Sequence, residues 1–147
     1  SRRRLYTQAI EAHQKAIAAD PDFARAHTHL GIAYSLKGDR VQAVNAHLKA
    51  IELDASLAQA HFNLGVEYAQ MRRLQEAIAA FEHAVELDPN YAKAHSNLAQ
   101  MYNKQGNRRL AAHHLSRVRQ LDAAAARKGH SLSAMPWATG TPAPSGG

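Results

Sequence analysis

The chain has 147 residues, of which 46% are hydrophobic, 20% are charged and none is cysteine. This size suits one small globular domain, and the lack of cysteine excludes a disulfide framework and a cysteine-based zinc site. No apolar run reaches the ~18 residues of a membrane helix, and the start lacks a signal-peptide core, so we expect a soluble protein of unknown compartment. Because the sequence starts at Ser1 instead of Met, we expect a processed chain or a piece of a longer one.

The formal net charge of +6 is concentrated in the last third of the chain. Residues 1–89 hold 10 basic and 11 acidic residues, whereas residues 90–147 hold 8 basic residues against Asp122 alone. Such a basic end suits an acidic peptide, a nucleic acid or an anionic surface, and net charge does not choose among them.

Small and apolar residues recur with helical spacing along most of the chain. Their pattern predicts helices near 3–18, 24–36, 40–52, 58–70, 74–86, 92–104 and 108–121, with an extension of the last toward Lys128. Turn residues such as Gly38-Asp39 separate them, and the Asp-Pro pairs at 20–21 and 88–89 favour the end of one helix and the start of the next. No strand pattern is present.

Aligning the chain on itself at an offset of about 34 residues, which brings His27 onto His61, reveals an internal repeat. Columns of identical residues coincide at this offset: His27, His61 and His95; Leu30, Leu64 and Leu98; Tyr34, Tyr68 and Tyr102; Ala43, Ala77 and Ala111. Each unit contains two helical patterns, so it is a helical hairpin. One hairpin cannot bury its own apolar face, and neighbouring units are therefore expected to stack.

These features resemble the tetratricopeptide repeat family over residues 3 to about 125. The resemblance is carried by the period, by Leu-Gly at 30–31 and 64–65, by the set Ala77, Phe81 and Ala84, and by Pro21 and Pro89. It implies an all-α, right-handed superhelical solenoid of antiparallel helix pairs. The expected units are a half repeat (1–23), three repeats (24–57, 58–91 and 92–128, the last with a short extension) and a tail (129–147).

The chain departs from the family pattern at three histidines. His27, His61 and His95 stand where the family often has Trp, and we interpret them as packing residues. No two of the ten histidines are spaced i, i+3 or i, i+4, so no pair of metal ligands lies on one helical face. No nucleophile motif or phosphate-binding glycine loop is present either. We expect no catalytic site, no metal, no cofactor and no enzymatic activity.

The resemblance also implies that the first helix of each repeat lines the inner face of the superhelix. At one repeat position on that face lie His29, Asn63 and Asn97. A carboxamide offers one acceptor and two donors, so it can hold a peptide unit by its C=O and N–H together. We therefore expect an extended protein or peptide partner. The full set of expected peptide-binding residues is His29, Asn63, Asn97, Arg25, Phe62, Gln70, Lys93, Gln100 and Lys104.

Two versions of such a groove compete. Residues 60–65 (AHFNLG) and 94–99 (AHSNLA) are similar to the repeats of O-linked N-acetylglucosamine transferase, whose asparagine column binds peptide backbones. The carboxylate-clamp repeats of chaperone adaptors match only at Asn63 and Lys93. One alternative function is therefore the recognition arm of a larger enzyme, such as a glycosyltransferase.

Another alternative is a basic end that binds nucleic acid or an anionic surface. It would rest on Arg108, Arg109, Arg117 and Arg119, but few aromatic residues are interleaved with them, so nucleic acid is the less favoured partner.

Two expectations concern the ends of the array. The leading half repeat and the trailing end expose surfaces that a further repeat would cover, so self-association is expected there. The tail is rich in Gly, Pro, Ser and Thr, which is linker composition. We expect its Met135, Pro136 and Trp137 to occupy a groove of the array.

Overall fold

The computed structural model describes residues 1–129, so the expectation for Met135, Pro136 and Trp137 lies outside the described residues. Within 1–129 the only regular secondary structure is helix, and the helix bounds agree with the sequence prediction to within a residue or two, with the last helix including the predicted extension toward Lys128. The helices are α1 (Arg2–Ala19), α2 (Ala24–Lys37), α3 (Arg40–Leu53), α4 (Ala58–Gln70), α5 (Leu74–Leu87), α6 (Ala92–Gln105) and α7 (Arg108–Arg127).

Local signals at the turns within repeats explain where helices end and begin. Gly38 and Gly106 end α2 and α6 in the left-handed conformation, with φ of 96° and 87°, which glycine adopts without steric cost. Asp39 then accepts a hydrogen bond from the backbone N–H of Gln42, and Asn107 does the same for Leu110. These side chains satisfy N–H groups that the first turn of a helix leaves unpaired.

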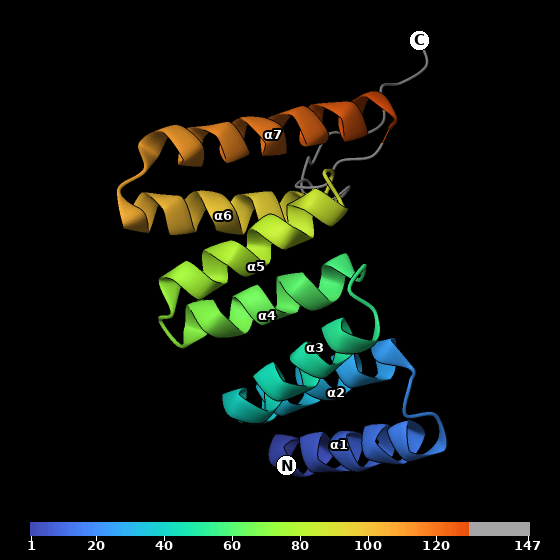
Figure 1. The fold of residues 1–147 in the computed structure, drawn as a ribbon. Helices are drawn as coiled ribbons and strands as arrows, with labels where there is room; N and C mark the ends of the chain where they lie inside the picture. Colours follow the sequence, from blue (N-terminus) through green and yellow to red (C-terminus); the bar gives the residue numbers. More distant parts are fainter. Residues whose placement is uncertain (130–147) are drawn as a thin grey trace.

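The helices stack as a solenoid of antiparallel pairs (Figure 1). Helices α2 and α3, α4 and α5, and α6 and α7 form the three hairpins, α1 packs on α2, and α3 and α5 each pack on the first helix of the following hairpin. The termini of the helical region lie at opposite ends of the stack. The predicted tetratricopeptide-type array is therefore confirmed. Self-association through its two ends stays a prediction.

Two glycines allow the helices of a hairpin to approach closely. A Cβ added to Gly31 would lie 2.5 Å from Cε1 of His47, and a Cβ added to Gly65 would lie 2.8 Å from Cδ1 and Cε1 of Phe81. Both rings are almost completely buried. In each of the first two repeats, a ring on the second helix is thus seated directly on the backbone of the first helix.

The histidines that recur at the same position of each repeat connect the first helix of the repeat to the loop before it. Nε2 of His27 lies 3.0 Å from the carbonyl of Pro21, Nε2 of His61 lies 3.1 Å from that of Ala55, and Nε2 of His95 lies 2.8 Å from that of Pro89. Each carbonyl is six residues upstream, in the loop that enters the helix. The histidines are packing residues, as predicted, and each also ties down an interhairpin loop by donating to its carbonyl.

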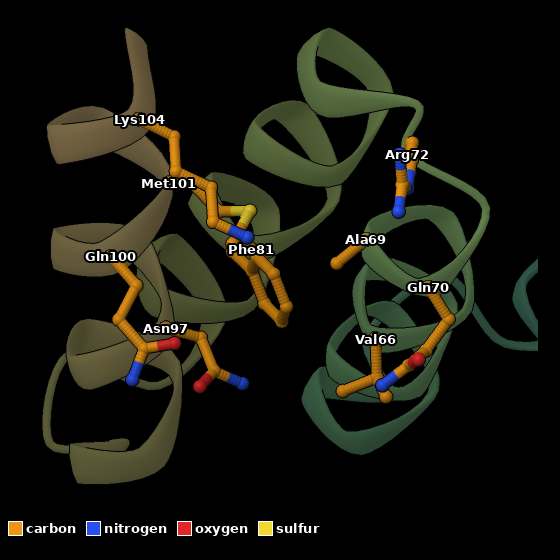
Figure 2. Close-up of a pocket in the computed structure, with 9 residues that line it drawn as sticks. All are labelled: Val66, Ala69, Gln70, Arg72, Phe81, Asn97, Gln100, Met101 and Lys104. Atoms are coloured by element: carbon orange, nitrogen blue, oxygen red, sulfur yellow. The ribbon is translucent and has the colours of Figure 1, made fainter. Parts of the chain in front are cut away.

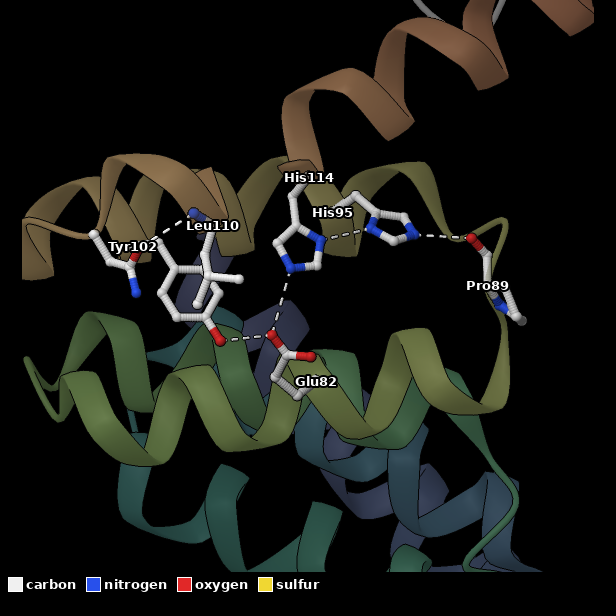
Figure 3. A network of polar contacts seen from close by, with 7 residues as sticks. Glu82, Pro89, His95, Tyr102, Leu110 and His114 are labelled. Carbon is white, nitrogen blue, oxygen red and sulfur yellow. Dashed lines mark hydrogen bonds and ion pairs between the residues drawn. The ribbon is translucent and has the colours of Figure 1, made fainter. Parts of the chain in front are cut away.

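At the last junction a polar network extends from the loop into the packed interior (Figure 3). Because Nε2 of His95 donates to Pro89, its Nδ1 is left to accept from Nδ1 of His114, 2.9 Å away. Nε2 of His114 lies 3.4 Å from a carboxylate oxygen of Glu82, a contact that is an ion pair when the His114 ring is protonated. The same oxygen accepts a 2.7 Å hydrogen bond from the Tyr102 hydroxyl. The network links α5, α6 and α7, and burial lowers the pKa of His114.

The seating of Phe81 on Gly65 predicts the effect of adding one methyl group there. Gly65→Ala should lower the free energy of unfolding by roughly 1–3 kcal/mol, because overpacking a buried site outweighs the smaller gain in helix propensity. Chemical denaturation measures the change. Ala99→Gly is the comparison at the same position of the next repeat, with an expected loss of about 1–2 kcal/mol from helix propensity and from the deleted buried methyl group. A Gly65→Ala protein as stable as the wild type would contradict this account.

Candidate functional site

Three of the pockets formed by residues 1–129 follow one another along the stack. The first, of 390 Å³, is lined by Tyr6, Ala9, His13, His29, Ile32, Ala33 and Leu36. The middle pocket, of 140 Å³, is lined by Ile32, Ser35, Leu36, His47, Asn63, Val66 and Glu67. The last, of 390 Å³, is lined by Val66, Ala69, Gln70, Arg72, Phe81, Asn97, Gln100, Met101 and Lys104.

The three pockets are one feature repeated along the array. The first and middle pockets share Ile32 and Leu36, and the middle and last pockets share Val66, so the three adjoin one another. Their linings also correspond from one repeat to the next. The corresponding columns are His13, His47 and Phe81; His29, Asn63 and Asn97; Ile32, Val66 and Gln100. We call this row of pockets the groove.

The groove contains six of the nine residues that the sequence singled out. His29, Asn63 and Asn97 each line one pocket, and Gln70, Gln100 and Lys104 join Asn97 in the last. In Figure 2 the side chains of Asn97 and Gln70 approach each other across the last pocket from α6 and α4. The structure therefore brings the column and the C-terminal polar residues together. Their role in binding stays a prediction.

The other three predicted residues lie elsewhere. Arg25 borders a separate 70 Å³ pocket that it shares with His29. Phe62 is half-buried and packs between Phe81 and Tyr91, with ring centroids 5.6 and 5.0 Å away. Lys93 is exposed and lines none of the three pockets of the groove. Phe62 is thus held by hydrophobic packing, so its ring is less free for a ligand than its position on the helix implied.

The middle pocket has polar atoms that lack partners. Among the described residues, Nδ1 of His47 and Nδ2 of Asn63 are buried and make no hydrogen bond. Burial lowers the pKa of His47 to about 4, so this ring is neutral at pH 7. Glu67 is also buried, but its carboxylate is paired with Arg40 at 3.1 Å. An unpaired buried donor costs about 1–3 kcal/mol, so a polar occupant of this pocket would be stabilised.

The first pocket is mainly apolar, with two histidines on its wall. The rings of His13 and His29 lie 5.9 Å apart, one on α1 and one on α2. Burial, and then the nearby His29, lower the pKa of His13. Tyr6, Ile32 and Leu36 supply the apolar surface. No carboxylate or permanently charged cation lines this pocket.

Sequence reasoning missed several groove residues. His13 could have been found, because it coincides with His47 and Phe81 when the repeats are aligned. Arg72 could also have been found, since it stands where Gly38 and Gly106 stand in the other repeats. Met101 gives no comparable signal, because a methionine on a predicted helix is typical of an ordinary core position.

The basic end of the array is partly engaged in structural contacts. The Arg117 guanidinium donates to the Asn90 side chain at 2.6 Å and to the Pro89 carbonyl at 3.4 Å, so it braces the loop before α6. Among residues 1–129, no group of three or more His, Asp or Glu side chains is placed to hold a metal ion. In the same part of the chain, no helix combines the length and apolar character needed to cross a bilayer.

Comparison with known families identifies the repeats. Family models described as tetratricopeptide repeat match residues 58–91 and 80–111, and one described as TPR repeat matches residues 6–38. No curated protein sequence matches the chain. The more specific similarity to O-linked N-acetylglucosamine transferase stays a prediction, as does the absence of enzymatic activity.

Similar solved structures include several of MamA. One is 27% identical with a TM-score of 0.79, and the alignment covers 84% of this chain and 72% of that one. Another is 30% identical with a TM-score of 0.65, covering 77% of this chain and 66% of that one. MamA from Desulfovibrio magneticus is 24% identical with a TM-score of 0.73, covering 81% and 67%, and supports the fold alone.

The buried His47 predicts a pH-dependent stability. Its folded-state pKa of about 4 is below the unfolded value of 6.5, so the unfolded chain takes up a proton that the folded chain does not. Stability should therefore fall as pH drops from about 6.5 to about 4, by roughly 2–3 kcal/mol for this residue. Chemical denaturation across this range should show a shallower slope for His47→Phe, whose ring matches Phe81 of the next repeat.

The same variant can also contradict the predicted pH dependence of stability. If His47→Phe and the wild type lose stability in parallel between pH 6.5 and 4, His47 does not titrate as a buried neutral ring.

Proposed function

We propose that this chain, which is a tetratricopeptide repeat array, is a protein-interaction scaffold that holds an extended peptide in the groove. One observation carries the proposal: the polar column of His29, Asn63 and Asn97 places one member in each of three adjoining pockets. A column of one exposed and two half-buried polar residues would have no reason to coincide with a continuous row of pockets if no ligand bound there.

The side chains of the column suit a peptide backbone. A carboxamide donates to a carbonyl and accepts from an N–H, which are the two polar groups that every peptide unit presents. The unpaired Nδ2 of Asn63 is the donor that such a contact would satisfy after a rotation of the amide. His29 can supply one donor and one acceptor from its ring. The grip would therefore be largely independent of the side chains of the partner.

The spacing of the pockets supports the same conclusion. The column stands on α2, α4 and α6, the first helices of successive repeats, and α2 and α4 contact each other directly. A step on the order of the 8–10 Å between neighbouring helices matches the roughly 10 Å that three residues of extended chain span. Successive members of the column can therefore meet every third residue of one strand. A helical ligand, which rises only about 1.5 Å per residue, would need about six residues for the same step.

The proposal predicts separate effects on binding and stability. Asn63→Ala with Asn97→Ala should weaken binding of a peptide selected on the wild-type chain by about tenfold or more, because two pairs of backbone contacts are lost. Isothermal titration calorimetry measures the affinity. The melting temperature should not fall by more than a few degrees, since neither residue belongs to the core and Asn63→Ala removes a buried donor that has no partner.

Two control variants separate loss of groove contacts from other effects on binding. Asn45→Ala removes a carboxamide from an exposed site on α3 outside the groove and should leave affinity unchanged. Leu64→Ala should unfold at least the central repeat through a core loss of roughly 2–5 kcal/mol. Normal peptide affinity in the double asparagine variant would show that the column does not hold the ligand.

A further inference from the structure

The turn between α4 and α5 departs from the equivalent turns of the other two repeats. Those turns read Gly38-Asp39 and Gly106-Asn107, with a glycine in the left-handed region and an N-cap that receives a backbone N–H. The middle turn has Arg72-Arg73 instead. Both advantages are lost there, because an arginine is held at a φ of 61° and the N-cap position makes no side-chain capping bond.

The two arginines of this turn differ in their surroundings. Nε of Arg73 lies 2.6 Å from a carboxylate oxygen of Glu76, and its guanidinium lies over the Tyr68 ring at 5.1 Å. The Arg72 side chain has no ion-pair or hydrogen-bond partner among residues 1–129, and it lines the last pocket of the groove. Arg72 thus occupies a backbone conformation that is unfavourable for a residue with a side chain, and this side chain lines the last pocket.

The rest of the last pocket has matching chemistry. Lys104 lines the opposite wall and has no ion-pair partner within the described part of the chain, and Figure 2 shows its side chain extending from α6 toward the cavity. The carboxamides of Gln70, Asn97 and Gln100 complete the polar lining. No carboxylate lines this pocket, so nothing on its wall neutralises the two cations.

We propose that the last pocket binds the carboxylate side chain of an Asp or Glu residue in the partner peptide, an inference that rests on the proposed function. The forked guanidinium of Arg72 can donate two parallel hydrogen bonds to one carboxylate, and the Lys104 ammonium adds a second positive charge. The carboxamides are left to hold the peptide backbone beside it. Solvent exposure of both cations makes the attraction sensitive to salt.

Because the first and last pockets differ in chemistry, the position of the acidic residue would set how the peptide is placed along the groove. The first pocket has an apolar lining with two histidines and no arginine or lysine, and it lies two repeats away. Two repeats correspond to about 20 Å, or about six residues of extended chain. The acidic residue of the partner should therefore stand near one end of the bound segment, next to the C-terminal repeat of this chain.

Selection from a library of random dodecapeptides on the intact chain, followed by affinity measurement, tests the proposal. Peptides selected on the wild type should be enriched in Glu or Asp at one position, and Glu→Gln there should weaken binding about tenfold. For Arg72→Asn combined with Lys104→Gln, the affinity ratio of the Glu and Gln peptides should fall close to one. Asn suits the left-handed conformation, so folding is preserved. Arg119→Gln, an exposed charge loss on α7, should keep the full ratio.

Each contrary outcome has a distinct meaning. Selected peptides without acidic enrichment, or with a Glu preference that survives the double variant, overturn the proposal. If those peptides still lose affinity on Asn63→Ala with Asn97→Ala, the proposed function stands while this inference falls. A requirement for a free C-terminal carboxylate in place of an internal Glu also overturns it. Failure to select any peptide counts against both.

Stability gives a second readout that does not need a ligand. Arg72→Gly should raise the melting temperature by a few degrees, because glycine adopts this φ without strain, while it weakens the preference for Glu. If Arg72→Gly instead lowers the melting temperature, Arg72 supports the fold. The unfavourable backbone position of Arg72 would then no longer support the proposal.

Discussion

The seating of a buried ring on a helical glycine is the constraint on which the rest of this structure depends. Phe81 lies against Gly65 so closely that one methyl group would not fit between them. The same ring contacts Phe62, belongs to the main core cluster and forms a wall of the last pocket. The contact therefore sets the distance between the helices of a hairpin and, with it, the shape of the groove.

The ring-on-glycine contact occurs in the first two hairpins, as Gly31 with His47 and Gly65 with Phe81, and each of these rings lines a pocket of the groove. His13 and His47 stand where Phe81 stands, and each lines its own pocket. The repeats share a backbone arrangement but differ in the residues that line each pocket. The lining therefore changes from mainly apolar at the first pocket to cationic at the last. A core that repeats along the array thus carries a groove whose chemistry changes from one end to the other.

Three departures from favourable local chemistry lie in the groove, whereas the buried, unpaired Thr28 hydroxyl lies outside it. Asn63 has a buried unpaired donor, His47 has an unpaired ring nitrogen, and Arg72 occupies a backbone conformation that glycine would adopt at less cost. Sequences usually agree with their fold at every level, and exceptions concentrate at functional sites. The coincidence of these three residues with one row of pockets supports binding as the function of the groove.

The sequence predicted the helices and the array because the hydrophobic period reports directly on which residues are buried. It also placed Asn63 and Asn97 on one face, since a repeat fixes equivalent positions in space. The bonds from His95 to Pro89 and His114 could not be predicted, because they depend on side-chain rotamers at a junction between helices. The packing of Phe62 against Tyr91 was missed for the same reason.

The most direct measurement of the central claim is the NMR spectrum of the asparagine side-chain amides during titration with a selected peptide. The account predicts that the NH₂ signals of Asn63 and Asn97 shift together and saturate with the peptide, while those of Asn45 and Asn90 stay in place. Shifts confined to residues of α3, α5 and α7 that face away from the groove, with the signals of Asn63 and Asn97 unmoved, would contradict it.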